Sequence, residues 1–425
     1  MGFQKKILIL SYYWPPSGGS GVQRWMYFAK YLKRLGWEPV VITVDEKKAS
    51  YPVIDLSLLE EVKNIRVIKT STREPLRLYS WLRSGSTQEG IPQGEVATKS
   101  FFGKLAAYVR GNFFIPDARK GWVPFAVKAA QKILIEEEIN HLITTGPPHS
   151  THLTGLELSN QFEINWWVDF RDPWTDVFYN KQMQRTQSSE AKDVQIEKNV
   201  LQKANGVITT LGGDLHQSLK RKAPNQKFIA IANGFDAELI ASSKSHPPED
   251  VFHLVYTGLL TQQQAYSSII KALQKLDGDR PIRFSLAGNI SERIIEEIRM
   301  GLPKVEIVYH GYLDHAAAVA LMKSAHLLLN FIFDGAKTQM ISGKLLEYTA
   351  TEVPILSIGD PNSEAAKFIN KGSCAVMLDS NDLEGIISFI SKVSKYEGIL
   401  LNIFPEIENW SRESLSKELI KKCLG

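Results

Sequence analysis

Short apolar runs rich in β-branched residues recur along the whole chain, and they limit the folds open to it more than any other feature. The runs are nearly continuous in apolar residues, which is typical of parallel strands covered on both faces. Segments of helical period lie between many of them; one runs from Val22 to Leu35 and stops at Gly36. Strands that alternate with helices predict doubly wound α/β units. The runs form two series, residues 7–10, 40–44, 66–68, 141–145, 165–170, 206–211 and 228–232, then residues 252–257, 283–287, 305–309, 326–332, 354–358 and 375–378.

A polar stretch at residues 242–250, which contains Pro247 and Pro248, separates the two series. A chain of 425 residues is too long for one ordinary core. We therefore expect an α/β protein of two Rossmann-like domains that face a cleft. The first domain is expected over residues 1–237 and the second over residues 238–405. Residues 84–100 are rich in Gly, Ser, Gln and Thr without periodicity, which predicts a mobile surface loop.

Charge and cysteine content exclude several classes of protein. The net charge of +4 is only mildly basic, and we expect no nucleic-acid partner. Cys374 and Cys423 are the only cysteines, so neither a disulfide framework nor a cysteine-rich metal site can form. No apolar run reaches 18 residues, and the run at residues 7–10 is too short for a signal peptide. We expect a cytoplasmic protein, at most attached to a membrane surface, with no metal and no cofactor.

The first strand leads into a glycine-rich loop at residues 18–21, after which a helix begins. Glycines let the backbone approach a ligand closely, and free amides at a helix N-terminus favour an anion. A glycine turn that only joins a strand to a helix is the simpler alternative. The spacing is not G-x-G-x-x-G, so a nicotinamide dinucleotide site is disfavoured. We interpret Gly18 and Gly19 as candidate contacts for a bound anion such as a phosphate.

Two other polar segments follow apolar strands, where the carboxyl ends of strands face the ligand crevice of an open α/β sheet. His149 lies in the first segment, Thr-Gly-Pro-Pro-His-Ser, and could meet a sugar hydroxyl or cap a helix. The second, Asp-Phe-Arg-Asp-Pro-Trp, holds Asp169, Arg171 and Asp172, which could also form an ion-pair cluster that shapes a loop. Because Pro173 makes Asp172 a turn residue, we favour Asp169 as the carboxylate that accepts a proton from an acceptor hydroxyl.

A second candidate site lies at the start of a helix near residue 343. Lys344, Glu347 and Tyr348 fall on one face of this helix, which Ser342 is suited to cap. Amides near Gly343 and the ammonium of Lys344 could bind a diphosphate, and Glu347 could accept hydrogen bonds from both ribose hydroxyls. A surface pair of Lys and Glu is the alternative. The preceding strand and the glycine favour a ligand site.

Taken together, these segments resemble retaining glycosyltransferases of the family-4 type, which have the GT-B fold. The resemblance covers nearly the whole chain and is carried by short motifs in a fixed order. These are the Pro-Pro-x-x-Gly-Gly opening at 15, Asn-Gly-Phe-Asp at 233, Tyr-Thr-Gly at 256, Leu-Ala-Gly at 286, His-Gly at 310 and Gly-Lys-Leu-Leu-Glu-Tyr at 343.

The resemblance implies a nucleotide-sugar donor in the C-terminal domain and a glycan or lipid-linked saccharide acceptor in the N-terminal domain. It implies transfer with retention and without an essential metal, and a C-terminal helix at residues 406–425 that returns to the first domain. In this hypothesis Lys344 stabilises the departing diphosphate and Glu347 holds the ribose. Donor contacts are also expected from four glycines, Gly18, Gly19, Gly258 and Gly343. Asp169 with His149 positions the acceptor hydroxyl, and Arg171 and Asp172 lie on the acceptor side.

The chain departs from the family pattern at two places. Members commonly carry an Arg and a Lys after the glycine at position 258, but here no cation follows until Lys271. Gln339 stands where the family has the first of two glutamates, and Lys337 or Lys344 could supply the missing charge. A GT-B-like protein that binds a sugar nucleotide or glycan without turnover is therefore an alternative, as is a sugar-nucleotide epimerase.

Aromatic and cationic residues alternate between residues 99 and 122. Such a mixture can bind an anionic lipid surface or a single-stranded nucleic acid. An amphipathic helix packed on the domain is the simpler interpretation. Between a lipid surface and a nucleic acid, we favour the lipid surface, as peripheral contact with the inner, cytoplasmic face of an anionic membrane.

Overall fold

The computed structural model describes residues 5–49, 51, 53–74, 108–176, 184–210, 212–276, 280–332 and 343–425. The chain divides into two compact units. Unit 1 comprises Met1–Ala232 with Leu415–Gly425, and unit 2 comprises Asn233–Ser414. The division after Ala232 comes five residues before the predicted one at 237. Of the predicted C-terminal segment 406–425, only residues 415–425 group with unit 1. The loop predicted at 84–100 lies outside the described residues.

Over the described residues, unit 1 is built on a seven-stranded sheet with the order β3-β2-β1-β4-β5-β6-β7, and its strand pairs are parallel. The strand order reverses between β1 and β4, so the ends of these strands flank the switch point at which open α/β sheets bind ligands. The strands are β1 (Lys5–Leu10), β2 (Trp37–Val44), β3 (Arg66–Thr70), β4 (His141–Gly146), β5 (Asn165–Phe170), β6 (Gly206–Thr209) and β7 (Phe228–Ala230).

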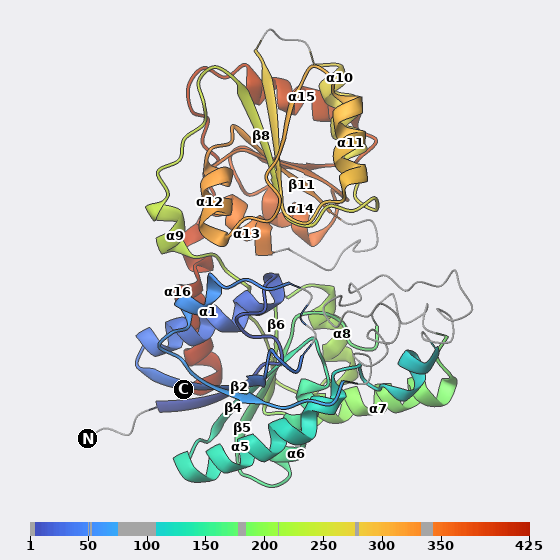
Figure 1. Cartoon of the computed structure of the whole chain (residues 1–425), viewed down its shortest axis with the longest axis vertical. Coiled ribbons are helices and arrows are strands. Elements are labelled where there is room, and N and C mark those ends of the chain that lie inside the picture. Colours follow the sequence, from blue (N-terminus) through green and yellow to red (C-terminus); the bar gives the residue numbers. More distant parts are fainter. Residues whose placement is uncertain are drawn as a thin grey trace. The chain divides into compact units, whose positions relative to one another are not determined.

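Helices cover both faces of this sheet, with α1 on one face and α5 and α6 on the other (Figure 1). Helix α1 buries the stripe that includes Trp25, Ala29 and Leu32, and it ends before Gly36, whose φ is +86°. The helices are α1 (Ser20–Arg34), α2 (Leu58–Glu61), η1 (Lys120–Trp122), α5 (Val123–Glu137), α6 (Thr151–Ser159), α7 (Gln187–Lys203) and α8 (Asp214–Lys222).

Unit 2 repeats this plan over its described residues. Its six-stranded sheet has the order β10-β9-β8-β11-β12-β13 with parallel pairs. The strands are β8 (Phe252–Thr257), β9 (Ile282–Ala287), β10 (Glu306–Tyr309), β11 (Leu327–Phe331), β12 (Ile355–Ile358) and β13 (Ala375–Leu378). The helices are α9 (Ala237–Ser242), α10 (Ser267–Gln274), α11 (Glu292–Gly301), α12 (His315–Lys323), α13 (Gly343–Ala350), α14 (Glu364–Ile369), α15 (Leu383–Ser394) and η4 (Ile407–Trp410), followed by α16 (Arg412–Leu419) and η5 (Ile420–Leu424).

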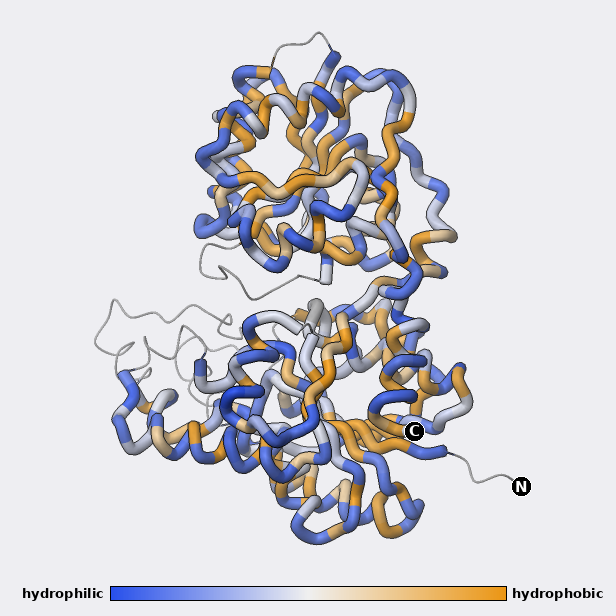
Figure 2. The backbone as a smooth tube through the Cα atoms, turned by 180° about the vertical axis from the view of Figure 1, so that it is seen from behind, coloured by the Kyte–Doolittle hydropathy of each residue, from blue (hydrophilic) through white to orange (hydrophobic). Residues whose placement is uncertain are grey.

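Each unit has its own apolar core, and the strands stand out as hydrophobic runs in Figure 2. A third, smaller cluster in unit 2 joins α9, α12, α13 and η4. We call it the junction cluster; its buried members are Phe235, Ile240 and Val319, with Leu239, Ala350, Ile407 and Trp410 packed against them. In the described part of the chain, no helix is both long and apolar enough to cross a membrane.

The packing of α6 on β5 tests this description of unit 1. A Cβ on Gly155 would lie 2.3 Å from the ring of Trp166, whose Nε1 donates to Thr144 Oγ1 at 3.0 Å. Gly155→Ala should therefore lower the free energy of unfolding by roughly 1–3 kcal/mol, the usual cost of overpacking. Denaturant titration followed by tryptophan fluorescence reports on unit 1, since Trp410 is the one of nine tryptophans that lies outside it.

Gly212→Ala is the matched control, because a Cβ there would meet no atom within 4 Å. Equal unfolding midpoints for the two variants would contradict the packing described for α6.

Candidate functional site

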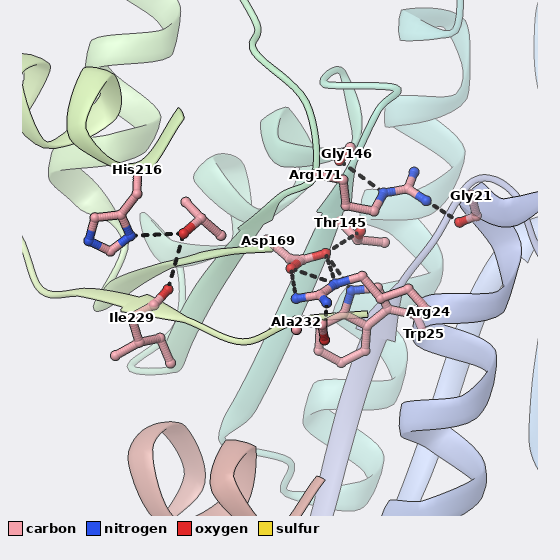
Figure 3. Close-up of polar contacts among 11 residues, drawn as sticks. Gly21, Arg24, Trp25, Thr145, Gly146, Asp169, Arg171, His216, Ile229 and Ala232 are labelled. Atoms are coloured by element: carbon pink, nitrogen blue, oxygen red, sulfur yellow. Dashed lines mark hydrogen bonds and ion pairs between the residues drawn. The ribbon is translucent and has the colours of Figure 1, made fainter. Parts of the chain in front are cut away.

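The carboxylate of Asp169, near the end of β5, is completely buried in unit 1 (Figure 3). Its Oδ1 accepts hydrogen bonds from Nε and Nη2 of Arg24 at 3.1 and 2.8 Å. Its Oδ2 accepts from Nε1 of Trp25 at 2.7 Å and from Oγ1 of Thr145 at 2.8 Å. The Nη1 of Arg24 donates to the carbonyl of Ala232 at 2.8 Å. Protein donors therefore already occupy both oxygens of this carboxylate.

The Asp169–Arg24 pair changes the interpretation of the strand-end carboxylate. Burying a charge is costly unless it is paired and hydrogen-bonded, and this one is both. The sequence favoured Asp169 as the group that meets an acceptor hydroxyl. The geometry does not support direct proton transfer there, because Asp169 has no exposed surface and no free oxygen. It joins α1, β4 and β5 instead.

Arg171, predicted on the acceptor side, binds the protein's own backbone. Its Nε donates to the carbonyl of Gly146 at 3.1 Å, and its two terminal nitrogens donate to the carbonyls of Gly21 and Pro147. Figure 3 shows Arg171 between Gly146 and Gly21. Burial lowers the pKa of Arg171, and the charge of Asp169 opposes this effect. The guanidinium thus fastens the start of α1 to the loop between β4 and α6.

His149 lies in that same loop and is nearly buried. Its ring stacks on Trp174 with centroids 5.1 Å apart and an interplanar angle of 8°. Burial, followed by the effect of His152, lowers the pKa of His149 well below its ordinary value. The imidazole is therefore neutral near pH 7 and packs as an aromatic ring.

Asp172 differs from its neighbours because it is partly exposed and accepts no hydrogen bond from the described residues. Burial raises the pKa of its carboxyl, and the charge of Arg171 opposes this rise. A carboxyl with a shifted pKa and no internal donor is available to an external one. Among the three charged residues of this segment, Asp172 is the one open to a ligand.

The glycines of the first loop have different roles. The amide of Gly18 donates to the carbonyl of Val53 at 2.9 Å, and a Cβ on Gly18 would lie 2.9 Å from Cγ1 of Val53. Gly18 is therefore required for close packing rather than for a free amide. Gly19 precedes α1 with φ +93°, and a Cβ there would meet no atom within 4 Å. The loop is thus open to an approaching group at Gly19.

In unit 2, three neighbouring strands are followed by glycines with positive φ: Gly258 at +119°, Gly288 at +118° and Gly311 at +66°. A Cβ on Gly288 would lie 2.2 Å from the carbonyl oxygen of Gly258, so the backbones approach too closely for a side chain. The amide of Gly258 donates to the carbonyl of Ala287 at 2.8 Å. Gly258 consequently contributes space at this edge rather than a hydrogen-bond donor.

The side chain of Lys344, in the first turn of α13, lies in the space beside Gly258. A Cβ on Gly258 would lie 3.3 Å from the Nζ of Lys344. This Nζ donates to the hydroxyl of Tyr256 at 3.0 Å and lies 4.1 Å from the centre of the Tyr256 ring. Burial lowers the pKa of Lys344, so a neighbouring anion would stabilise its charged form. The structure thus brings together two residues that the sequence placed at the donor.

The loop after Gly258 contains three glutamines, Gln262 to Gln264, and no cation. Gln264 holds this loop: its Nε2 donates to the carbonyl of Phe331 at 3.1 Å, and its Oε1 accepts from the amide of Thr261 at 2.8 Å. Its side chain is therefore committed to the loop. Ser342, Lys337 and Gln339, which the sequence analysis also considered, lie outside the described residues.

Glu347 lies one helical turn beyond Lys344 and is 8% exposed. Its Oε1 accepts hydrogen bonds from Nε2 of His315 at 2.8 Å and from Nη2 of Arg412 at 3.3 Å. Burial alone would raise the pKa of Glu347, but His315 and Arg412 outweigh it and hold the pKa below its usual value. Glu347 is therefore a charged carboxylate inside unit 2, and no longer a candidate for a surface ion pair.

The residues that hold these candidates in place were not predicted from the sequence: Arg24 and Trp25 around Asp169, Tyr256 under Lys344, and His315 and Arg412 on Glu347. An arginine within the apolar stripe of α1 was a usable signal for Arg24. No comparable pattern marks the other partners. In the described residues, no group of three or more His, Cys, Asp or Glu side chains is placed to hold a metal ion.

The Asp169–Arg24 pair gives a direct test of its structural role. Asp169→Asn leaves Arg24 buried without its counter-charge, so the free energy of unfolding of unit 1 should fall by about 3–5 kcal/mol. Asp172→Asn, an equally conservative change three residues along, should shift it by less than about 0.5 kcal/mol. Denaturant titration with tryptophan fluorescence measures both. Equal losses would show that the pair does not stabilise unit 1.

No protein-family model matches the sequence, and no curated protein matches it either. Solved structures do resemble it. A glycosyltransferase from Rickettsia africae aligns over 99% of this chain and 94% of its own, with 13% identity and a TM-score of 0.59. Anabaena HepE in complex with UDP aligns over 98% of both chains, with 12% identity and a TM-score of 0.57. UDP-GlcNAc 2-epimerase from Neisseria meningitidis, bound to UDP-GlcNAc, aligns over 99% of both chains, with 12% identity and a TM-score of 0.53.

At these identities the likeness concerns the fold. Two parallel sheets, with strand orders that reverse at β1–β4 and at β8–β11, agree with such neighbours over nearly the whole chain. The predicted fold class is confirmed: the chain has two Rossmann-like, doubly wound α/β units of the GT-B type.

Proposed function

We propose that this protein transfers a sugar from a nucleoside-diphosphate donor, bound by unit 2, to a glycan or lipid-linked saccharide acceptor, bound by unit 1. One observation carries the proposal. At the carboxyl end of the unit 2 sheet, the half-buried ammonium of Lys344 lies beside Gly258, and the charged carboxylate of Glu347 follows one turn later on α13. A cation and a carboxylate in this order match a diphosphate joined to a ribose.

The donor we propose is a uridine diphosphate sugar. The Anabaena neighbour is a complex with UDP, and the Neisseria neighbour is a complex with UDP-GlcNAc. Both support a uridine nucleotide as the group that a chain of this fold would bind. The identity of the sugar depends on contacts of loops, which the fold does not determine.

Lys344 has the central chemical role in this proposal. Negative charge develops on the diphosphate as the bond to the sugar breaks, and a fixed cation in a poorly hydrated site stabilises that charge. Desolvation raises the free energy of the Lys344 ammonium in the absence of a ligand, as its lowered pKa indicates. The family resemblance supports retention of configuration and independence from metal, with Lys344 taking the position of the missing cations after Gly258.

On the acceptor side, we assign the acting carboxylate to Asp172 and no longer to Asp169, which the sequence had favoured. Asp172 is the group that meets the acceptor hydroxyl, because its oxygens have no donor among the described residues. Asp169, Arg171 and His149 shape the loop that presents it. Gly19 is the open point of the first loop and is available to either substrate.

Lys344→Ala tests the proposal most simply. Loss of a half-buried cation next to a diphosphate should weaken UDP binding at least tenfold and reduce hydrolysis or transfer from a UDP-sugar to background. Isothermal titration calorimetry and UDP-release assays measure the two effects. Lys367→Ala, at an exposed lysine paired with Glu364 on α14, is the control and should change neither. Unchanged UDP affinity in Lys344→Ala would contradict this assignment.

A second candidate is a sugar-nucleotide epimerase, and the specific observation for it is the likeness to the Neisseria epimerase over 99% of both chains. Binding without turnover is a third, because the loop after Gly258 carries Gln264 and no cation. Incubation with UDP-GlcNAc separates these functions by NMR. An epimer formed without acceptor indicates the epimerase, and tight binding with no product indicates the binding protein.

We also propose that the protein is cytoplasmic and touches the inner face of an anionic membrane. Three neighbouring apolar side chains of unit 1 are exposed: Tyr108 at 40%, Val109 at 38% and Phe113 at 66%. Arg110 lies between them along the chain, and the exposed Lys120 donates to the carbonyl of Phe113. Aromatic and cationic groups so placed suit an anionic lipid surface. Residues 99–107 of the predicted segment lie outside the described residues.

Co-sedimentation with vesicles tests this contact. At low salt the protein should bind phosphatidylglycerol vesicles and not phosphatidylcholine vesicles, and Phe113→Ser should weaken binding several-fold. Met300→Ser removes an apolar side chain of unit 2 that is 76% exposed and should leave binding unchanged. No binding to anionic vesicles at low salt would exclude the membrane contact.

A further inference from the structure

We propose that His315 and Arg412 are positioning residues that hold one oxygen of Glu347, so that this carboxylate offers the donor ribose only its other oxygen. This inference rests on the proposed donor function of unit 2 and deepens it. It also departs from the sequence hypothesis, in which Glu347 accepts hydrogen bonds from both ribose hydroxyls.

Both contacts of Glu347 fall on the same atom. Nε2 of His315 lies 2.8 Å from Oε1, and Nη2 of Arg412 lies 3.3 Å from it. The three side chains are 12%, 5% and 11% exposed for His315, Arg412 and Glu347, so water competes little for these bonds. An ionised carboxylate only accepts hydrogen bonds, so His315 carries its proton on Nε2 and donates.

The two donors to Oε1 of Glu347 come from helix starts that other contacts hold in place. His315 is the first residue of α12, and Asp314 caps that helix by accepting from the amide of Ala317 at 2.8 Å. Arg412 begins α16, and its amide donates to the carbonyl of Phe235 at 2.9 Å. The junction cluster packs α12, α13 and η4 together through apolar contacts. The two donors therefore come from the first residues of α12 and α16, and the junction cluster fixes α12 against α13, which carries Glu347.

The other oxygen is left for a ligand. No described residue donates to Oε2 of Glu347, whereas Oε1 already accepts from two donors. A carboxylate oxygen has about two lone-pair sites, so Oε1 has little remaining capacity. Lys344 lies one turn before Glu347 on the same helix, which places the diphosphate and the ribose in sequence along α13. Because the two hydroxyls of a vicinal diol cannot both lie in line with a single oxygen, Oε2 makes one strong hydrogen bond to the ribose and at most one bent, weaker one.

The first experiment compares ribose analogues on the full-length protein. Calorimetric titrations with UDP, 2′-deoxy-UDP and 3′-deoxy-UDP should show an asymmetry. Loss of the hydroxyl that binds Oε2 should weaken affinity about tenfold, as expected for a hydrogen bond to a charged group, and loss of the other by less than about threefold. Equal losses for both analogues would overturn the one-oxygen arrangement.

The second experiment tests His315 as a positioning residue. His315→Leu frees Glu347 to turn, and UDP affinity should fall about tenfold while affinity for 2′,3′-dideoxy-UDP stays the same. His315→Gln retains an amide donor near Nε2 and should restore most of the UDP affinity. His246→Ala, at an exposed histidine of unit 2, is the matched control and should affect neither ligand.

The outcomes separate this inference from the function on which it rests. Equal losses for UDP and dideoxy-UDP in His315→Leu would indicate a general structural role and overturn the positioning role. No loss for either ligand would overturn it as well. Failure of the wild-type protein to bind UDP would instead contradict the proposed donor function, and the inference with it.

Discussion

The buried ion pair between Arg24 and Asp169 is the interaction on which the arrangement of unit 1 depends. It is satisfied by groups from α1, β4 and β5, and Arg24 also binds the carbonyl of Ala232, the residue after which the chain enters unit 2. Because a buried charge without partners costs several kcal/mol, none of these elements can shift alone without exposing an unpaired group. The pair thus fixes both the loop that carries Asp172 and the point at which the chain leaves the sheet.

The charged side chains of unit 2 are matched less completely by protein partners than those of unit 1. This difference distinguishes a site that can bind a ligand from an ion pair that stabilises the fold. In unit 1, Asp169 has both oxygens engaged by protein donors. In unit 2, Lys344 has an aromatic ring and a hydroxyl beside it and forms no ion pair with a carboxylate in the described part of the chain, and Glu347 is held through Oε1 alone. A charged side chain that lacks a full set of partners within the protein can obtain the missing partner from a charged ligand. This contrast is the physical reason for placing the donor at α13.

Much of the architecture could be predicted from the sequence, because continuous apolar runs and helical periods are local signals. The two sheets, and the meeting of Lys344 with Gly258, follow from strand ends that share one edge of a sheet. The role of Asp169 could not be predicted, since its partner Arg24 lies 145 residues away and a strand-end carboxylate looks the same whether free or saturated. His315 and Arg412 are likewise 32 and 65 residues from Glu347.

The donor site that we propose lies at the start of α13, where the diphosphate and ribose of a nucleotide would bind. A crystal structure of the protein with UDP tests it most directly. We expect the diphosphate within hydrogen-bonding distance of Nζ of Lys344, and one ribose hydroxyl on Oε2 of Glu347 with His315 and Arg412 still on Oε1. UDP bound elsewhere, or with its phosphates away from Lys344, would contradict it.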